Sequence, residues 1–334
     1  MKILLDDKKN FYKANMHCHS TYSDGRSNVS ELKEAYMAQG YSIIAYTDHE
    51  HIIDNSHLTD ENFLAITSCE LAIKEYPLQS TLKNYHLKTT HLNFYALDPH
   101  NTVTPCYSSI YDKQFLKDDY RHLVRYEKEY ERSYTPECIN EMIKIGNEKG
   151  FLVSYNHPSW SLEDLSIYGK YENVFAVEIY NHGCFKTGLN DDEHVYDDFL
   201  RQGKRVYCTA CDDNHNKVPF DDTQNDSFGG WVCINAEKLD YATIMDALQK
   251  GNFYASKGPQ IFSLTQDGDK VRIKTSQCRS IGISTYGRRA VTFYEDKEPL
   301  TEAEFTLHET DRYFRIRVTD KNGNSAYTQA YFLD

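Results

Sequence analysis

Short apolar runs that end in a histidine or a carboxylate recur along the first 256 residues of this 334-residue chain. Four clusters that follow such runs are His17-Cys18-His19, Asp48-His49, Asn156-His157-Pro158 and Asp212-Asp213-Asn214-His215. Helical patterns separate several of these runs. Strands that alternate with helices favour a parallel sheet, whose carboxyl ends gather polar side chains at one edge. About seven such units predict an α/β fold closed into a barrel.

Strand patterns cover 11–16, 41–46, 63–68, 91–96, 151–155, 174–180 and 205–211. Helix patterns cover 29–39, 137–149, 193–202 and 239–250. Asn28 and Glu31 have the spacing of a capping box, which predicts the start of the first helix. Residues 100–134 interrupt the alternation and are rich in Tyr, Lys, Asp and Glu. They predict an insertion, either a solvated helical excursion or a lid over the substrate.

The pattern changes after about residue 256. Ser256-Lys257-Gly258-Pro259 is typical of a turn or linker, and short alternating stretches with Asn/Gly/Asp turns follow it. We therefore expect two domains: residues 1–256 form the barrel, and residues 257–334 form a small all-β, sandwich-like domain.

Composition limits the partners and the compartment. The formal net charge is −13, and no block of five basic residues occurs, so a long nucleic acid is a poor candidate partner. A small phosphorylated molecule stays compatible, since bound divalent ions would add positive charge locally. No apolar run approaches ~18 residues, and the N-terminus lacks a signal-peptide pattern. With nine scattered cysteines, these features predict a cytoplasmic protein with reduced thiols, and they leave its oligomeric state open.

The residue types in the clusters are those that divalent metals prefer. Alternate residues of a strand point the same way, so His17 and His19 can chelate one ion together. Asp213 and His215 have the same spacing, and Asp24 lies on the loop after His19. A carboxylate such as Glu70 can bridge two ions. A cluster of two or three ions polarises a phosphoryl or carbonyl oxygen and supplies activated hydroxide near neutral pH.

The order of these motifs resembles that of the PHP (polymerase and histidinol phosphatase) metal-dependent phosphoesterases. The resemblance covers roughly residues 10–256. It implies a distorted seven-stranded (β/α) barrel that holds two or three ions of manganese, iron or zinc. The tail that begins at Gly251-Asn252-Phe253-Tyr254 is similar to the CehA/McbA-like branch, which adds a C-terminal β domain.

The resemblance also implies roles for individual residues. The expected metal ligands are His17 and His19 for a first ion, with Glu70 bridging to a second ion held by His91 and His157, and Asp24, His49 and His215 for a third. Asp213 would close the first site, and the spacing before His215 favours it over Asp212. All of these except His91 and Asp212 are also expected to be catalytic.

Other residues have simpler interpretations. We expect Glu178 to make a structural hydrogen bond, for example to a metal-binding histidine, and Asp48 to orient a neighbour. Arg26 and Lys186 are either phosphate contacts or ordinary surface charges, and the second is the default. The predicted function is hydrolysis of a small phosphate ester. The alternatives are a carboxylic ester, amide or carbamate hydrolase with the same metals, and a non-catalytic binding protein.

Overall fold

The computed structural model describes residues 1–75 and 87–333. A large sheet contains β2 (Asn10–Cys18), β3 (Ile43–Tyr46), β4 (Leu64–Lys74), β5 (Thr89–Ala96), β8 (Phe151–Tyr155), β9 (Ala176–Asn181), β10 (Tyr207–Cys211), β11 (Trp231–Ala236), β12 (Phe253–Ser256), β15 (Ser280–Thr285), β16 (Ala290–Tyr294), β18 (Tyr313–Thr319), β19 (Ser325–Thr328) and β20 (Tyr331–Phe332). A four-stranded sheet contains β1 (Lys2–Leu5), β13 (Ile261–Asp267), β14 (Lys270–Cys278) and β17 (Leu300–Thr306). The short strands β6 (Val103–Thr104) and β7 (Arg125–Tyr126) form a separate pair.

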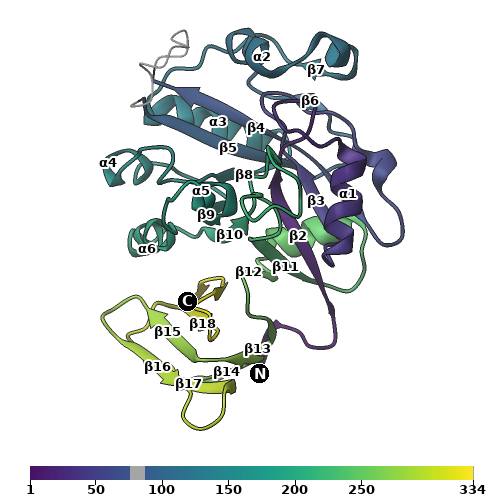
Figure 1. Cartoon of the computed structure of the whole chain (residues 1–334). Coiled ribbons are helices and arrows are strands. Elements are labelled where there is room, and N and C mark those ends of the chain that lie inside the picture. Colours follow the sequence, from purple (N-terminus) through teal and green to yellow (C-terminus); the bar gives the residue numbers. More distant parts are fainter. Residues whose placement is uncertain (76–86, 334) are drawn as a thin grey trace.

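The α-helices are α1 (Val29–Ala38), α2 (Ser109–Phe115), α3 (Pro136–Glu148), α4 (Leu165–Tyr168), α5 (His182–Lys186), α6 (Glu193–Arg201) and α7 (Tyr241–Gln249). Two 3₁₀ helices are η1 (Ser56–Leu58) and η3 (Asp118–Leu123). The molecule is therefore a mixed α/β protein with a large sheet, and Figure 1 shows the strands after β12 in a separate lower body.

Seven strands of the large sheet lie in the order β10-β9-β8-β5-β4-β3-β2. The predicted parallel pairing is confirmed within β2–β3–β4 and β8–β9–β10, but it is wrong for β5, which is antiparallel to both β4 and β8. A strand's residue pattern alternates identically in both directions, so its own residues do not encode its direction.

The two outer strands of this group meet at one end. The Asp213 backbone N–H donates to the His17 carbonyl at 2.9 Å, and the His19 N–H donates to the Asn214 carbonyl at 3.1 Å. These bonds bring the residues that follow β10 against the end of β2. The ligand candidates His17 and His19 are thereby placed beside Asp213, which comes almost 200 residues later in the chain.

Local signals explain how the helices start. The Asn28 side chain accepts the backbone N–H groups of Ser30 and Glu31, and the Glu31 carboxylate accepts the Asn28 N–H, so the predicted capping box is present. Thr135 caps α3, whose first residue is Pro136. Buried apolar faces then dock the helices: α1, α3, α6 and α7 all pack on strands of the sheet.

The C-terminal region contains β13 to β20 and, among the described residues, no helix. One apolar core joins Leu264, Val271 and Ile273 of the four-stranded sheet to Ile283 and Ile316 of the large sheet. Two sheets that share a core in this way form a sandwich-like layer pair. β1 pairs with β13 and adds the N-terminal residues to this unit, and Figure 1 places the N-terminus beside β13. A domain boundary at residue 256 stays a prediction.

The interruption at 100–134 contains β6, α2, η3 and β7. A buried ion pair ties it to the main sheet: the Arg132 guanidinium lies 2.7 Å from the Glu50 carboxylate, and both side chains are fully buried. Arg132 also donates to the backbone carbonyls of Ala72 and Cys106. The insertion is thus held against β4 rather than extending into solvent.

Within the described residues, no helix is long and apolar enough to cross a membrane. All nine cysteines lie in the described part, buried and with free thiols. Burial raises the pKa of several of these thiols, for example that of Cys208 to about 12.

Candidate metal centre

The predicted site residues lie on six strands or on the segments that directly follow them. They are His17 and His19 at the end of β2, Asp24 in the turn after it, His49 after β3, Glu70 inside β4, His91 inside β5, His157 after β8, and Asp213 and His215 after β10. All of these except Asp24, Asp213 and His215 are buried. The fold thus brings together side chains that are up to 198 residues apart, from His17 to His215.

The Glu70 carboxylate lies in the middle of the cluster. Its Oε1 lies 3.2 Å from His17 Nε2, 3.0 Å from His91 Nδ1 and 3.4 Å from His157 Nε2. Its Oε2 lies 3.0 Å from His49 Nδ1 and 3.5 Å from His19 Nε2. The two oxygens therefore face two different groups of imidazoles, as expected of a carboxylate shared between two ions.

Several of these close atoms do not form hydrogen bonds. His49 Nδ1, His91 Nδ1 and Glu70 Oε2 are buried and have no hydrogen-bond partner among the described residues. Burying an unpaired polar atom costs about 1–3 kcal/mol. Nitrogen and oxygen atoms that lie about 3 Å apart without hydrogen-bond geometry are suited to a common central ligand. The residues present therefore fit divalent ions.

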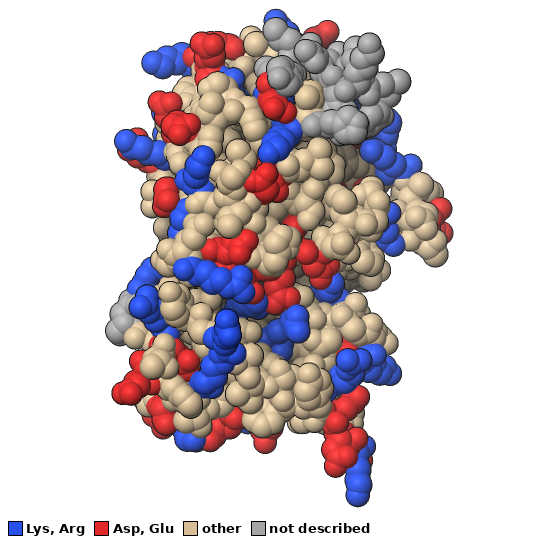
Figure 2. Space-filling view, turned by 90° about the vertical axis from the view of Figure 1, so that its left-hand side faces the viewer, with Lys and Arg blue, Asp and Glu red and all other residues tan. Residues whose placement is uncertain are grey.

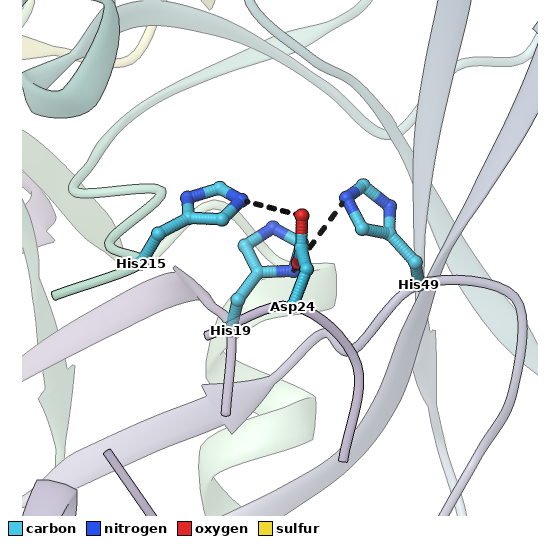
Figure 3. Close-up of side chains that lie close together, drawn as sticks. All are labelled: His19, Asp24, His49 and His215. Carbon is cyan, nitrogen blue, oxygen red and sulfur yellow. Dashed lines mark ion pairs between the residues drawn. The ribbon is translucent and has the colours of Figure 1, made fainter. Parts of the chain in front are cut away.

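A second group surrounds Asp24. Its oxygens lie 3.4 Å from His215 Nε2, 3.8 Å from His49 Nε2 and 3.8 Å from His19 Nδ1. Figure 3 shows the rings of His215 and His49 on either side of Asp24, with His19 between them. These four residues have ligand atoms within 4.8 Å of one another, which is close enough to share an ion.

Gly25 explains why Asp24 can fold back over the strand. A Cβ atom at Gly25 would lie 2.6 Å from the His19 carbonyl oxygen, so no larger residue fits this close approach. Asp48 holds the same turn, because its carboxylate accepts hydrogen bonds from the backbone and hydroxyl groups of both Ser20 and Ser23. The orienting role predicted for Asp48 agrees with this position.

The two neighbouring aspartates point to different places. Asp213 Oδ1 lies 2.9 Å from His19 Nε2 and 3.2 Å from His17 Nε2. Asp212 instead accepts the backbone N–H groups of Phe228, Gly229 and Gly230 and the Tyr36 hydroxyl, each at 2.8 Å. Asp213 has a φ of 53°, in the left-handed region, which contributes to the turn between them. The structure thus places Asp213 in the cluster and Asp212 outside it.

Glu178 connects three parts of the site. Its Oε1 lies 3.0 Å from His17 Nδ1, and its Oε2 accepts the His157 backbone N–H at 2.9 Å and the Asn181 amide at 2.9 Å. Asn181 also donates to Asp213 Oδ2 at 3.0 Å. A carboxylate behind a histidine fixes the direction of the opposite ring nitrogen. This arrangement agrees with the hydrogen-bonding role predicted for Glu178, although its oxygen also lies within ligand range of His17 and His157.

Burial and charge act in opposite directions on the site pKa values. Burial lowers the pKa of His91 to about 4, against the raising effect of Glu70. Burial would also lower the pKa of His215, but the carboxylates of Asp24 and Asp213 outweigh the effect of burial and raise this pKa to about 9. Burial would raise the pKa of Glu70, yet His91, His17 and His49 hold it well below its usual range. An ionised Glu70 and a neutral His91 are the forms that bind metals.

A cavity of about 540 Å³ opens in front of the cluster. Asp24, Glu70, His91, His157 and Asp213 are among its lining residues. The sequence analysis had not singled out five of the other lining residues: Lys74, Phe115, Trp160, Gly183 and Lys217. Lys186 also lines the cavity, whereas Arg26 is exposed and outside it. These lysines and aromatics follow no motif and come from different kinds of element, for example Lys74 from the end of β4 and Phe115 from the end of α2, so no sequence signal indicated them.

Comparisons with known proteins place the chain as follows. No protein-family model matches it, and no curated protein matches it. A two-domain Bacteroides vulgatus protein containing a predicted PHP-like metal-dependent phosphoesterase is 13% identical over 100% of this chain and 98% of its own, with a TM-score of 0.43. A Bifidobacterium adolescentis protein, provisionally assigned as a metal-dependent phosphoesterase, is 15% identical over 64% and 91%, with a TM-score of 0.38. An amidohydrolase from Chromobacterium violaceum, solved with sulfate and no metal, is 13% identical over 60% and 87%, with a TM-score of 0.36.

The first of these structures is described as containing a predicted PHP-like metal-dependent phosphoesterase, the family that the motifs of this chain resemble.

Proposed function

We propose that this protein is a metal-dependent hydrolase that cleaves a small phosphate ester at a site of two or three divalent ions, with manganese, iron and zinc as the candidate metals. The observation that carries the proposal is the position of Glu70. Its two oxygens face two groups of imidazoles, and several of the facing atoms lack hydrogen-bond partners. Such a buried set of nitrogen and oxygen atoms is a multinuclear ligand set.

The ligands in this proposal are His17, His19, Asp24, His49, Glu70, His91, His157, Asp213 and His215. Asp212 is left out, because its carboxylate is occupied by three backbone N–H groups and a hydroxyl. We further propose that β10-β9-β8-β5-β4-β3-β2 form the distorted seven-stranded barrel, closed by the backbone bonds between the ends of β2 and β10.

Bound divalent ions supply Lewis-acid polarisation of the phosphoryl group and activation of water near neutral pH. In the overall reaction the water oxygen forms a new P–O bond, the ester P–O bond breaks, and the leaving oxygen gains a proton. The chain's own residues orient the site. Glu178 directs His17, Asn181 holds Asp213, and the Asn156 amide donates to Glu70 Oε1 at 2.8 Å.

The proposed partner is a small phosphorylated molecule, and the proposed compartment is the cytoplasm. Lys and Arg are intermingled with Asp and Glu on the described part of the face in Figure 2, an arrangement unlike the basic stripe that binds long nucleic acids.

The test combines metal analysis with two substrates. The protein is purified, loaded in turn with Mn²⁺, Fe²⁺ or Zn²⁺, and analysed for bound metal by mass spectrometry. Each preparation is then assayed with p-nitrophenyl phosphate and p-nitrophenyl acetate. We expect about two or three ions per chain and release of phosphate.

The other outcomes separate the alternatives. Bound metal with cleavage of only the acetate would replace the phosphoesterase by a carboxylic ester, amide or carbamate hydrolase. A chain that takes up none of the three metals would support a non-catalytic binding protein and refute both hydrolases.

A further inference from the structure

The cavity in front of the metal centre is larger than a phosphate group requires. Its volume of about 540 Å³ lies in the range of sites that take a whole small molecule. Its lining also changes with depth. Glu70, His91 and His157 are buried, whereas Lys186 is half-buried and Lys217 is exposed. The two lysines therefore lie at the rim, where the part of a substrate beyond the scissile phosphate would lie.

Within the described residues, neither rim lysine forms an ion pair with a carboxylate. Lys186 Nζ donates to the Thr223 carbonyl at 2.7 Å, and Lys217 has no hydrogen bond or ion pair within the described part of the chain. Asp226 also lines the cavity, and its oxygens accept the backbone N–H groups of His215 and Asn216 at 2.8 and 2.9 Å. Two ammonium groups that form no ion pair among the described residues give the rim of this acidic protein a local positive charge that attracts an anion.

Two aromatic rings line the same cavity. The Phe115 ring, from α2 of the insertion, lies 4.2 Å from the His49 ring. The Trp160 ring lies 4.9 Å from the His157 ring, and the side chain is 44% exposed. An exposed tryptophan wall offers apolar surface that a ligand would cover.

We propose that the leaving group of the substrate carries a second acidic group, a carboxylate or a phosphate, which Lys186 and Lys217 bind. Phe115 and Trp160 cover the apolar body between this group and the scissile phosphate. The inference rests on the proposed phosphoesterase function and adds the substrate class to it. It also assigns Lys186 and Lys217 as the residues that determine specificity.

The kinetic test uses three substrates with the same ring. Phenyl phosphate has one acidic group, 4-carboxyphenyl phosphate adds a carboxylate, and 1,4-phenylene bisphosphate adds a phosphate. We expect the metal-loaded protein to have a higher kcat/KM for at least one of the two-acid substrates than for phenyl phosphate. The substrate preference is the kcat/KM of the better two-acid substrate divided by that of phenyl phosphate. In Lys186→Met/Lys217→Met this ratio should fall about tenfold, as expected for lost charge-assisted contacts.

The matched control changes two lysines that do not line the cavity. Lys144 and Lys250 are exposed and pair with Glu148 and Asp246 on their own helices. Lys144→Met/Lys250→Met alters the net charge equally and should keep the wild-type ratio. The single variant Lys217→Met removes no hydrogen bond of the described structure, so a lowered ratio there cannot be attributed to misfolding. An unchanged ratio in both rim variants, or no preference in the wild type, would overturn the proposal.

A binding measurement separates this inference from the proposed function. Phenylphosphonate and 4-carboxyphenylphosphonate cannot be hydrolysed, and 1,4-phenylenediphosphonate completes the set. Calorimetric titration of the metal-loaded protein should show tighter binding of a two-acid compound, and this advantage should be lost in the rim variant. If no phosphate ester is cleaved but the difference in binding is present, the phosphoesterase function fails and the anion site stands. Equal binding of all three compounds refutes the anion site.

Discussion

At the scale of single residues, the site depends on which atoms face one another. Glu70 serves both groups of imidazoles, whereas Asp212, next to the proposed ligand Asp213, serves the backbone of 228–230. The neighbouring residues Asp212 and Asp213 therefore have different roles, and substitution of each should have a different effect.

Glu70→Gln should lower metal content and activity together. The substitution removes the negative charge and one acceptor oxygen from the centre of the ligand set. Loss of an outer hydrogen-bond partner costs about 10–100-fold in metal affinity, so loss of this shared ligand should cost about 100-fold or more. Metal titration and phosphate release measure both effects. Glu298→Gln, at an exposed position, is the control, and full metal occupancy in Glu70→Gln would contradict the role of Glu70.

Asp212→Asn and Asp213→Asn should have opposite signatures. In Asp212→Asn an amide nitrogen would face one of the N–H donors, so the free energy of unfolding should fall by about 1–3 kcal/mol while the metal count is kept. Asp213→Asn should lose metal. Urea unfolding and metal analysis of the two variants side by side check this. Loss of metal only in Asp212→Asn would reverse the assignment.

At the scale of elements, the insertion is fixed to the sheet by buried charge. Arg132 forms an ion pair with Glu50, the residue after His49, and neither side chain has exposed surface. α2, on the same insertion, then places Phe115 against the His49 ring. Phe115 of the insertion thereby forms part of the cavity wall.

Arg132→Met should destabilise the protein by about 3–5 kcal/mol, because it leaves the Glu50 carboxylate buried without its partner. The double variant Glu50→Gln/Arg132→Met should lose less, since no uncompensated charge stays behind. Chemical denaturation of the two variants and the wild type gives the comparison. If the double variant were the less stable of the two, an uncompensated Glu50 would not be the cause.

At the scale of the whole molecule, the C-terminal strands dock on the α/β part through specific polar contacts. Arg315 of β18 lies 2.7 Å from both Glu193 and Asp197 of α6. The Gln329 side chain bonds the backbone N–H and carbonyl of Cys208 in β10 at 2.8 and 3.0 Å. Strand β12 also pairs with β19, so one sheet runs through both regions.

Arg315→Met should therefore lower the stability of the whole chain. Arg315 is buried, but its two partners keep about a fifth of their side-chain surface exposed, so we expect a loss of about 2–3 kcal/mol, less than for a fully buried pair. Calorimetry should show a lower Tm for a single transition, while the exposed Arg288→Met stays near the wild type. Two separate transitions in the wild type would show that the contact does not couple the regions.

Sequence patterns were enough to predict most of the strands and helices around the site and its chemically suited residues. Short-range signals were sufficient there: the Asn28–Glu31 capping box starts α1, the alternating apolar runs mark the strands, and histidines with carboxylates at strand ends indicate metals. Other features became visible only in the folded chain. The direction of β5, the pairing of β1 with β13, and the turn of Asp212 away from the cluster all depend on contacts between distant segments. The position of Lys186 and Lys217 at the rim of the cavity also depends on such contacts. A sequence pattern encodes local periodicity, whereas packing across the whole chain decides which side chains face one another.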